Sequence, residues 1–485
     1  MVQNRAPTEA ELADLKAALA KHGQEHLLHF WPTLTDIQRS HLYADIKSLD
    51  LARVNLDFVA AMKTSGAESQ SKLDALIAPL PADRVGSTTD KANAKQWRQH
   101  GLELIADGKC AVLLLAGGQG TRLGTADPKG MYDVGLPSHK SLYQLQGERI
   151  VRLQQLAAET SKKASVTLMW YVMTSDTTDA KTKEFFASHN NFGLRADQIF
   201  FFEQENIPCM SFEGKIILAS PWQISRAPNG NGGLFSSMER SGALSDMEKR
   251  GIERVHVYGV DNVLVRLGDP VFFGYCSEKK VDCGNKVVAK AYPDEPVGVL
   301  CLCEGKLRVV EYSEITKETA ARTNAAGELV FNAGNIANHM FSVPFLRALL
   351  TEHRDALVHH VAKKKIPFVD VASGQIVTPK EPNGVKLEMF VFDVFPLSTN
   401  SGALQVLRDE EFSPLKNAPG AGKDCPETCR ADLLNLHASY VAAAGGRLLP
   451  DAAVEISPLV TYAGEGLEPY TMNKIFKDTT VVLPK

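Results

Sequence analysis

A glycine-rich turn is the segment of this sequence best suited to chemistry. It is followed closely by an Asp-Pro-Lys-Gly string, and the two segments are Leu113-Leu-Leu-Ala-Gly-Gly-Gln-Gly-Thr-Arg-Leu-Gly124 and Asp127-Pro-Lys-Gly130. Gly117, Gly118 and Gly120 carry no side chain, so backbone N–H groups can point at anionic oxygens there, and a helix that began nearby would add its dipole. Arg122 can grip a phosphate with two hydrogen bonds, and Lys129 adds a mobile positive charge. The turn therefore predicts a site for nucleotide phosphates.

Two familiar phosphate-binding motifs do not fit this turn. The dinucleotide-binding fingerprint needs a glycine three residues after Gly120, where Leu123 stands. The P-loop needs Gly-Lys followed by Ser or Thr, where the sequence has Pro128-Lys129-Gly130. These mismatches exclude a dehydrogenase and a P-loop kinase. A tight turn between a strand and a helix, without a ligand, stays open as the structural alternative.

Short apolar runs that alternate with amphipathic segments begin at Ala111 and indicate how the turn is positioned. The runs expected to be strands cover residues 111–116, 167–174, 198–202, 255–260, 287–291 and 297–303. This alternation is typical of an α/β domain with a mainly parallel sheet. Ligands of such sheets bind beyond the carboxyl ends of the strands, so residues that directly follow the runs are the first candidates for a site.

Helical patterns flank this domain on both sides. Thr8 and Glu11 form a capping box for a helix that Gly23 is expected to end, and a second helix follows. Further helices are expected over residues 35–51, 91–107 and 431–445. The predicted organisation is a helical N-terminal region over 1–107, an α/β domain over 108–396 and a small C-terminal domain over 397–485.

Composition limits the class of protein and its partners. The 485 residues are 44% hydrophobic and 23% charged, which is typical of a globular protein with two or three domains. A net charge of -4 and the lack of a long Lys/Arg block argue against nucleic acid as a partner. The eight cysteines have no metal-site spacing and indicate reduced thiols. We expect a cytoplasmic protein without a membrane segment, with organellar targeting left open, because neither a signal pattern nor an apolar run of ~18 residues is present.

The glycine-rich turn also carries a family resemblance. Leu115-Ala-Gly-Gly-Gln-Gly-Thr-Arg-Leu-Gly124, with Pro-Lys downstream, resembles the signature of the sugar-nucleotide pyrophosphorylases. Its continuation, Lys129-Gly-Met-Tyr-Asp-Val-Gly-Leu-Pro-Ser138, is similar to the eukaryotic UDP-N-acetylglucosamine pyrophosphorylases in particular. The similarity reaches from Gly23–Leu28 to Ser457–Glu468. It implies a Rossmann-like, GT-A-like nucleotidyltransferase core with a mixed, mainly parallel sheet, and makes residues 108–396 the catalytic domain.

The resemblance assigns the turn and three later segments to the nucleotide. Gln204 matches the family position that hydrogen-bonds uracil, and an amide can satisfy both the imide N–H and a carbonyl of this base. Asp261 follows an expected strand, where an Asp is by itself more often a turn or helix cap, but the resemblance places it at the Mg²⁺ and α-phosphate position. The implied nucleotide-binding residues are Leu115, Ala116, Gly117, Gly118, Gly120, Gln204, Gly230 and Asp261.

A sugar pocket and further cations are implied in the same way. Glu311 would accept two sugar hydroxyls, Gly298 would leave room for the ring, and Asn335, in a stretch that otherwise passes as a polar turn, would meet the N-acetyl group or a neighbouring hydroxyl. The implied sugar-binding residues are Asn231, Gly298, Glu311, Tyr312 and Asn335. The implied catalytic cations are Arg122, Lys129, Lys386 and Lys416. Asp393 is a second candidate Mg²⁺ ligand by its position at a strand end, with a capping role as the alternative.

The expected reaction is in-line attack of the N-acetylglucosamine 1-phosphate oxygen on the α-phosphorus of UTP, with pyrophosphate leaving. A sugar phosphate is mostly dianionic near neutral pH, so it needs no general base, and the site would act by positioning and charge stabilisation. We expect UTP and N-acetylglucosamine 1-phosphate as substrates, Mg²⁺ as cofactor and a monomer. Two alternatives stay open: a pyrophosphorylase for UDP-glucose, UDP-galactose or many UDP-sugars, and a non-catalytic sugar-nucleotide sensor.

Overall fold

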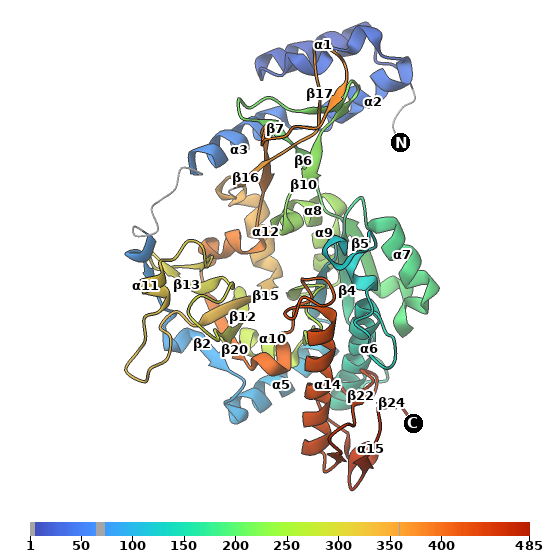
Figure 1. The fold of residues 1–485 in the computed structure, drawn as a ribbon, viewed down its shortest axis with the longest axis vertical. Helices are drawn as coiled ribbons and strands as arrows, with labels where there is room; N and C mark the ends of the chain where they lie inside the picture. The colour runs from blue at the N-terminus through green and yellow to red at the C-terminus, as the bar shows by residue number, and fades with distance from the viewer. Residues whose placement is uncertain (1–4, 65–72, 358) are drawn as a thin grey trace. The chain divides into compact units, whose positions relative to one another are not determined.

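The computed structural model describes residues 5–64, 73–357 and 359–485 (Figure 1). The chain forms two compact units. The smaller unit holds Met1–Glu68, Glu205–Leu234 and Arg354–Asp393, and the larger unit holds Ser69–Gln204, Phe235–His353 and Val394–Lys485. Because each unit is built from three separate stretches, the units do not follow the predicted ranges 1–107, 108–396 and 397–485.

The smaller unit combines the first helices with short antiparallel strands. Thr8 and Glu11 form the predicted capping box of α1, and Thr35 with Gln38 forms a second one at the start of α2. Leucines of these helices share an apolar core with strand residues such as Val385. The bounds are α1 Glu9–Lys21, α2 Asp36–Lys47, α3 Leu51–Thr64, β6 Asn206–Pro208, β7 Met210–Ser211, β8 Leu218–Ser220, β9 Gln223–Ile224, β10 Arg226–Pro228, β16 His360–Lys364, β17 Phe368–Val369, β18 Ile376–Val377 and β19 Gly384–Glu388.

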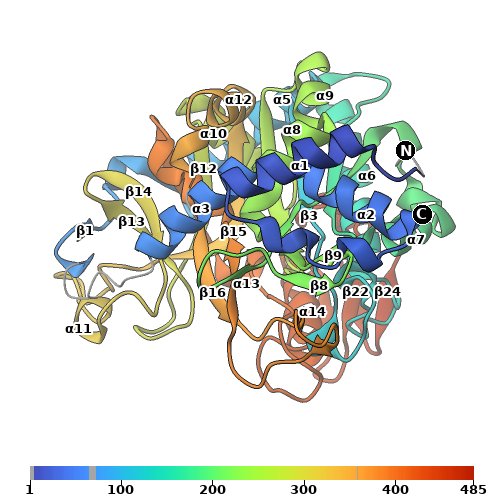
Figure 2. The ribbon, with the colours of Figure 1, turned by 90° about the horizontal axis from the view of Figure 1, so that it is seen from above.

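A mixed sheet forms the centre of the larger unit, with eight strands in the order β2-β20-β12-β15-β11-β3-β4-β5. Neighbours are parallel, except that β15 is antiparallel to both β11 and β12. Strand β13 joins β15 and carries β14 and β1 beside it (Figures 1 and 2). The predicted mainly parallel α/β sheet is confirmed. The bounds are β1 Ile77–Ala78, β2 Val85–Ser87, β3 Cys110–Leu115, β4 Met169–Thr174, β5 Ile199–Glu203, β11 Arg254–Gly259, β12 Cys283–Ala289, β13 Val299–Cys303, β14 Lys306–Val310, β15 Ala333–Ser342 and β20 Ser401–Val406.

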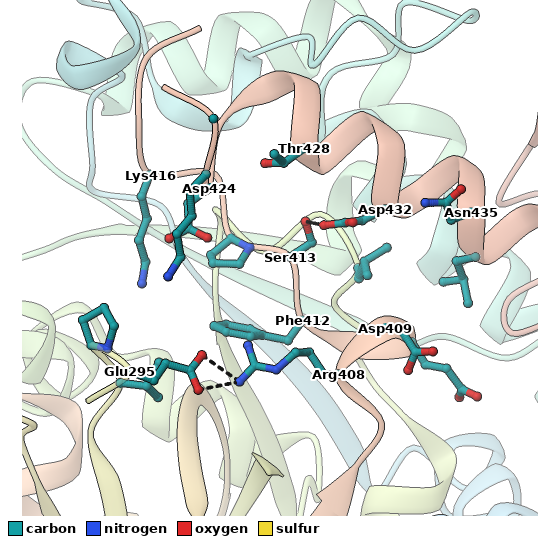
Figure 3. Close-up of a pocket in the computed structure, with 18 of the residues that line it drawn as sticks. Glu295, Arg408, Asp409, Phe412, Ser413, Lys416, Asp424, Thr428, Asp432 and Asn435 are labelled. Atoms are coloured by element: carbon teal, nitrogen blue, oxygen red, sulfur yellow. Dashed lines mark hydrogen bonds and ion pairs between the residues drawn. The ribbon is translucent and has the colours of Figure 1, made fainter. Parts of the chain in front are cut away.

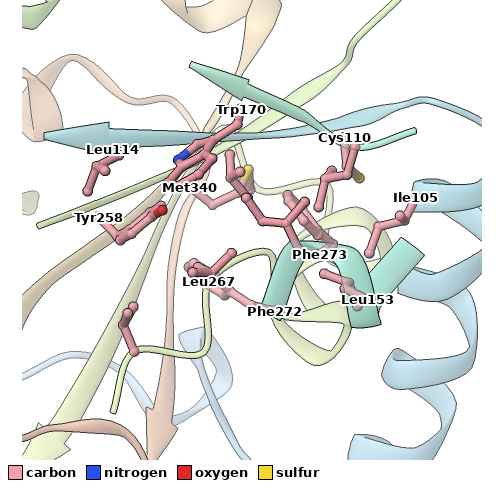
Figure 4. Close-up of a cluster of buried hydrophobic side chains, with 14 of the residues drawn as sticks. Ile105, Cys110, Leu114, Leu153, Trp170, Tyr258, Leu267, Phe272, Phe273 and Met340 are labelled. Atoms are coloured by element: carbon pink, nitrogen blue, oxygen red, sulfur yellow. The ribbon is translucent and has the colours of Figure 1, made fainter. Parts of the chain in front are cut away.

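Helices α5 (Lys91–Ala106), α6 (Leu142–Ser161) and α10 (Pro270–Glu278) cover one face of this sheet. Alternate strand residues, including Leu114 and Trp170, point into a shared apolar core with these helices (Figure 4). Two glycines let α5 and α10 approach closely, since a Cβ on Gly101 would lie 1.9 Å from the Pro270 carbonyl oxygen and one on Gly274 would lie 2.0 Å from that of Trp97. The packing fixes β3, and therefore the start of the glycine-rich turn.

Helices α9 and α12 cover the opposite face. Tyr171, which alternates with Trp170 along β4, donates a 2.7 Å hydrogen bond to Asp246 of α9. Phe341 of β15 stacks on Phe345 of α12. The core of the larger unit is therefore a sheet between two helical layers. The helices not yet bounded in this part of the chain are α7 Asp179–Ser188, α8 Leu234–Ser241, α9 Ala243–Lys249, α11 Lys317–Ala320 and α12 Val343–Thr351.

The C-terminal residues first complete the sheet and then form a smaller helical part. Strand β20 lies between β2 and β12, so the sheet continues past residue 396, where we expected the α/β domain to end. Residues 333–338 begin strand β15 instead of forming a polar turn. The expected C-terminal helix is present and starts earlier than residue 431. The remaining bounds are α13 Arg408–Glu411, α14 Pro426–Ala443, β21 Arg447–Leu448, β22 Val454–Ile456, α15 Glu468–Thr471, β23 Ile475–Phe476 and β24 Thr480–Val482.

No helix within residues 5–64, 73–357 and 359–485 has both the length and the apolar character needed to cross a membrane.

Candidate active site

The glycine-rich turn leaves the carboxyl end of β3 and folds back on itself. Gly120 N donates to Asp127 O at 2.9 Å, and Lys129 N donates to Gly118 O at 3.1 Å, which closes the turn. Within the described part of the chain, the backbone N–H groups of residues 117–119 donate no hydrogen bond. Successive N–H groups of this kind form concavities that bind phosphate oxygens. The N–H groups of residues 117–119 can therefore donate to an anion.

No long helix begins at this turn. The glycines are followed by two short 3-10 turns, Thr121–Leu123 and Lys129–Met131, and α6 begins only at Leu142. A helix dipole therefore does not contribute at these residues. Before the glycines, Leu115 ends β3, and Ala116 N donates to Met173 O at 2.7 Å, which holds the entry to the turn against β4.

The structure brings Gln204 to the glycine-rich turn. A Cβ on Gly117 would lie only 2.8 Å from Gln204 Oε1. The position of Gln204 is fixed from β4, because its N–H donates to Thr174 O at 2.8 Å. Ser175, which the sequence analysis did not select, donates from its hydroxyl to Gly117 O at 2.9 Å. The signal for Ser175 was its place directly after β4, at the same edge of the sheet as Gly117.

Lys129 and Asp261 meet beyond the ends of β3 and β11. Lys129 Nζ donates to Leu415 O at 3.0 Å and lies 4.0 Å from Asp261 Oδ2. Their side chains are 18% and 32% exposed, so both keep access to a ligand. Arg122 is exposed in the first 3-10 turn, and its guanidinium makes no ion pair with any residue that the structure describes. The larger unit thus gathers two cations and one carboxylate at the turn.

The predicted sugar residues of the larger unit lie together. Asn335 N donates to Gly298 O at 2.8 Å, and a Cβ on Gly298 would lie 3.1 Å from Glu311 Oε1. Burial raises the pKa of Glu311, and the charge of Glu314 adds to this effect, whereas Lys416 opposes it. Because Asn335 Oδ1 already accepts from the Ala337 N–H at 3.1 Å, Asn335 offers a ligand mainly its NH₂ group. Tyr312 follows Glu311 and is 50% exposed.

A cavity of about 690 Å³ adjoins this group (Figure 3). Lys416 and Val297 line it, so it borders both the predicted phosphate cations and the predicted sugar pocket. Glu295 and Arg408 form an ion pair of 2.8 Å in its wall. Neither residue was selected from the sequence, and no local pattern marks them, since they lie on segments far apart in the chain.

The smaller unit holds the other predicted site residues. Gly230 has a φ of 69°, and a Cβ there would lie 2.3 Å from Met389 O, so the loop needs glycine for its own packing. Asn231 Oδ1 accepts from the Val391 N–H at 2.9 Å. One acceptor position of Asn231, which the resemblance assigns to the sugar, is therefore used by the chain itself. Lys386 lies on β19, opposite Ala362 of β16.

Both carboxylate oxygens of Asp393 have partners within the smaller unit. Oδ2 accepts from the Phe390 N–H at 2.7 Å, and Oδ1 pairs with His360 Nε2 at 2.9 Å. The residue lies in a 3-10 turn, Val391–Leu397. These contacts are those of the capping role named as the alternative. They give no support to Asp393 as a metal ligand.

Comparison with known proteins places these features in a family. Residues 57–465 match the sequence model of the family described as UTP–glucose-1-phosphate uridylyltransferase. The chain belongs to this family. Human UDP-N-acetylhexosamine pyrophosphorylase-like protein 1 is 48% identical, with 97% of this chain and 96% of that protein covered. UDP-N-acetylglucosamine diphosphorylase 2 of Arabidopsis thaliana is 43% identical, with 97% and 94% covered.

A solved structure agrees with the architecture over nearly the whole chain. The uridine diphosphate N-acetylglucosamine pyrophosphorylase from Trypanosoma brucei, in complex with an inhibitor, superposes with a TM-score of 0.84 at 29% identity, and 99% of each chain is covered. The expected nucleotidyltransferase fold is confirmed. The resemblance drawn from the glycine-rich turn is confirmed as well, because relatives that match nearly the whole chain are named UDP-N-acetylglucosamine diphosphorylase or pyrophosphorylase.

Proposed function

We infer that this member of the uridylyltransferase family makes UDP-N-acetylglucosamine and pyrophosphate from UTP and N-acetylglucosamine 1-phosphate. The observation that carries the transfer is the meeting of Lys129 and Asp261 beside a turn whose N–H groups are free. The choice of sugar is supported by relatives at 40% to 48% identity whose names contain N-acetylglucosamine or N-acetylhexosamine.

The chain's own groups account for the chemistry without a general base. The N–H groups of residues 117–119 hold phosphate oxygens of UTP, while Lys129 and Arg122 oppose the charge that develops on the leaving pyrophosphate. Gln204 pairs with the uracil edge. Lys416 faces the cavity next to Glu311 and orients the sugar phosphate, whose oxygen attacks the α-phosphorus in line. Lys386, on β19 of the smaller unit, stays a prediction from the family resemblance.

We propose Mg²⁺ as the cofactor, with Asp261 as its one protein carboxylate. The donor set fits, because Mg²⁺ in phosphate sites commonly uses one or two carboxylates together with waters and substrate phosphates. Asp261 is partly exposed and its carboxylate lies near a lysine that also serves the phosphates. Bound there, Mg²⁺ would supply charge stabilisation to the phosphate oxygens. The partners of Asp393 leave it out of this proposal.

The two alternatives are less well supported. A UDP-glucose or broad-specificity enzyme would match the description of the family, but the names of the full-length relatives specify an N-acetylated sugar. A sugar-nucleotide sensor would have little need for the free Arg122 and for the approach of Lys129 to Asp261. We also propose a cytoplasmic location, in keeping with the scattered cysteines, and a monomer.

Pyrophosphate release from UTP tests the proposed function directly. Purified protein, UTP and Mg²⁺ are mixed with N-acetylglucosamine, N-acetylgalactosamine or glucose 1-phosphate, and pyrophosphate is measured over time. We expect the N-acetylglucosamine form to react fastest. Faster reaction of glucose 1-phosphate would support the UDP-glucose alternative, and no release with any sugar phosphate would support the sensor.

A further inference from the structure

Asn262 directly follows the proposed metal ligand and is 5% exposed. Its side chain makes three hydrogen bonds, all within the larger unit. Nδ2 donates to Glu411 O at 2.7 Å, and Oδ1 accepts from the N–H groups of Ser413 and Leu264 at 3.0 and 3.2 Å. The residues so joined lie on segments that are 149 positions apart. A single buried amide therefore connects the end of β11 to the segment 411–416.

Backbone hydrogen bonds extend this connection to the site residues. Val263 N donates to Ser413 O at 3.1 Å, and Leu415 N donates to Asp261 O at 2.8 Å. The carbonyl of the same Leu415 accepts from Lys129 Nζ at 3.0 Å. Lys416 follows at once and lines the cavity. The segment held by Asn262 therefore touches Asp261 and Lys129 and carries Lys416.

A buried ion cluster fixes the other end of the segment. The Lys286 ammonium of β12 is fully buried and lies 2.7 Å from Asp269 Oδ2 and 2.5 Å from Glu411 Oε2. Glu411 is therefore fixed twice: its backbone carbonyl accepts from Asn262, and its carboxylate pairs with Lys286. Such buried ionic contacts are costly to break, so the segment has little freedom to move while they are intact.

We propose that Asn262 is a positioning residue that sets the distance between Asp261, Lys129 and Lys416 by holding residues 411–416 against the end of β11. It touches no substrate and acts through these three groups. The proposal rests on the proposed function, because it assigns Asn262 to the transfer that those groups perform. Reacting groups held about 1 Å out of place can lose about a hundredfold in rate.

The variant Asn262→Leu keeps the approximate size of the side chain and removes all three hydrogen bonds. We expect kcat to fall about 10- to 100-fold while KM for UTP changes about threefold or less. The three site residues would still bind the substrate, but they would be misplaced for the transition state. A kcat within about twofold of wild type would overturn the proposal.

Gln198 provides a matched control. It is 2% exposed, its amide donates to Gln154 Oε1 and Leu168 O at 2.8 and 3.0 Å, and its oxygen accepts from the Arg195 N–H at 3.1 Å. It precedes β5 at the edge of the sheet opposite to the glycine-rich turn. Gln198→Leu therefore removes the same number of buried bonds, and we expect a lower melting temperature with unchanged kcat. Equal losses of kcat in both variants would mean that Asn262 only stabilises the fold.

A double-mutant cycle with Lys416→Ala separates positioning from general stability. If Asn262 acts through Lys416, Asn262→Leu adds little to the loss of kcat that Lys416→Ala already causes. If the fold-losses of kcat in the two single variants multiply in the double variant, the proposal for Lys416 is overturned. Should Asn262→Leu fail to fold, Asn262→Ser, which keeps a smaller acceptor, replaces it in the same cycle.

Hydrogen exchange gives a readout that does not depend on turnover. We expect the N–H groups of Val263, Ser413 and Leu415 to exchange faster in Asn262→Leu than in wild type, and to be unchanged in Gln198→Leu. Unchanged exchange at these positions would overturn the proposal even for an active protein. Failure of the wild type to release pyrophosphate would instead overturn the proposed function, so the two failures are distinguishable.

Discussion

At the scale of single residues, Lys129 has the most distinctive surroundings of the predicted cations. Its ammonium lies between Leu415 O and Asp261 Oδ2, which fixes it at the glycine-rich turn, whereas Arg122 is exposed and free to move. The sequence pattern predicted both residues because each belongs to a short motif with defined spacing. The contacts of Lys129 could not be predicted from the sequence, because Leu415 is far away in the chain.

Removal of either cation should affect rate more than stability. For Lys129→Ala and Arg122→Ala we expect kcat to fall about 10²- to 10³-fold, because each takes away a charge that stabilises the leaving pyrophosphate. Steady-state pyrophosphate release and the melting temperature are the measurements. Lys363→Ala, on the exposed side of β16, is the matched control and should leave kcat unchanged. Turnover within a few-fold of wild type in folded Lys129→Ala would contradict the assignment.

Glu311 should make binding of the sugar phosphate weaker at low pH. Burial raises the pKa of its carboxyl, so the ionised form, which accepts hydrogen bonds from sugar hydroxyls, is lost at a higher pH than for an ordinary glutamate. We expect KM for the sugar phosphate to rise as the pH is lowered through this raised pKa. Glu311→Gln cannot titrate and should show a higher KM that changes less with pH.

The comparison of wild type with Glu311→Gln is needed because the sugar phosphate itself titrates near pH 6. That ionisation affects both proteins alike, so the difference between the two KM profiles reports on Glu311. Identical profiles would show that Glu311 does not meet the sugar in its ionised form.

At the scale of elements, one strand and two helix termini share a buried charge cluster. Lys286 of β12 pairs with Asp269, the N-cap of α10, and with Glu411 at the end of α13. The sequence suggested nothing about this cluster, because a lysine in a strand is usually directed to solvent. Only the sheet order places β12 where its lysine faces two carboxylates.

Lys286→Met should destabilise the larger unit by about 3–5 kcal/mol, because buried Asp269 would lose its 2.7 Å ion pair and Glu411 would be left with its 3.6 Å contact to Arg266. Urea denaturation measures this change in the free energy of unfolding. Lys306→Met, at an exposed position of β14, is the control and should change that free energy by no more than about 0.5 kcal/mol. A Lys286→Met protein as stable as wild type would contradict this role of the lysine.

At the scale of the whole molecule, the larger unit contains three buried histidines that make its stability depend on pH. Burial lowers the pKa of His256, His339 and His437 to about 3, whereas the ordinary value is 6.5. Below pH 6.5 the unfolded chain therefore binds more protons than the folded chain. It follows that stability is lost as the pH falls from 6.5 towards 3, by up to about 1.4 kcal/mol per pH unit for each histidine.

His437→Asn tests this contribution. The asparagine oxygen can replace His437 Nδ1, which accepts from the Ile456 N–H at 3.1 Å, but it does not titrate. We expect the free energy of unfolding, measured between about pH 7 and about pH 5, to fall less steeply in the variant than in wild type. Parallel curves would show that His437 becomes protonated without unfolding.

The sequence by itself determined the features that depend on neighbours within a few residues. The capping box of Thr8 and Glu11 and the apolar runs that became β3, β4, β5 and β11 are of this kind. So is the glycine-rich turn, because the hydrogen bonds that close it join residues 118 and 120 to residues 129 and 127, which are close in the chain. These local signals also carried the family resemblance, which is why the type of reaction could be inferred before the structure.

The tertiary structure alone decided which distant segments meet. It placed β20 beside β12 and β15 antiparallel between its neighbours, although neither position has a local signal. It also showed that the oxygens of Asn231 and Asn335 serve their own backbone, and it joined Asn262 to Glu411 across 149 positions. The physical reason is that such pairings depend on packing and hydrogen bonding between residues whose distance in the chain leaves no periodic pattern.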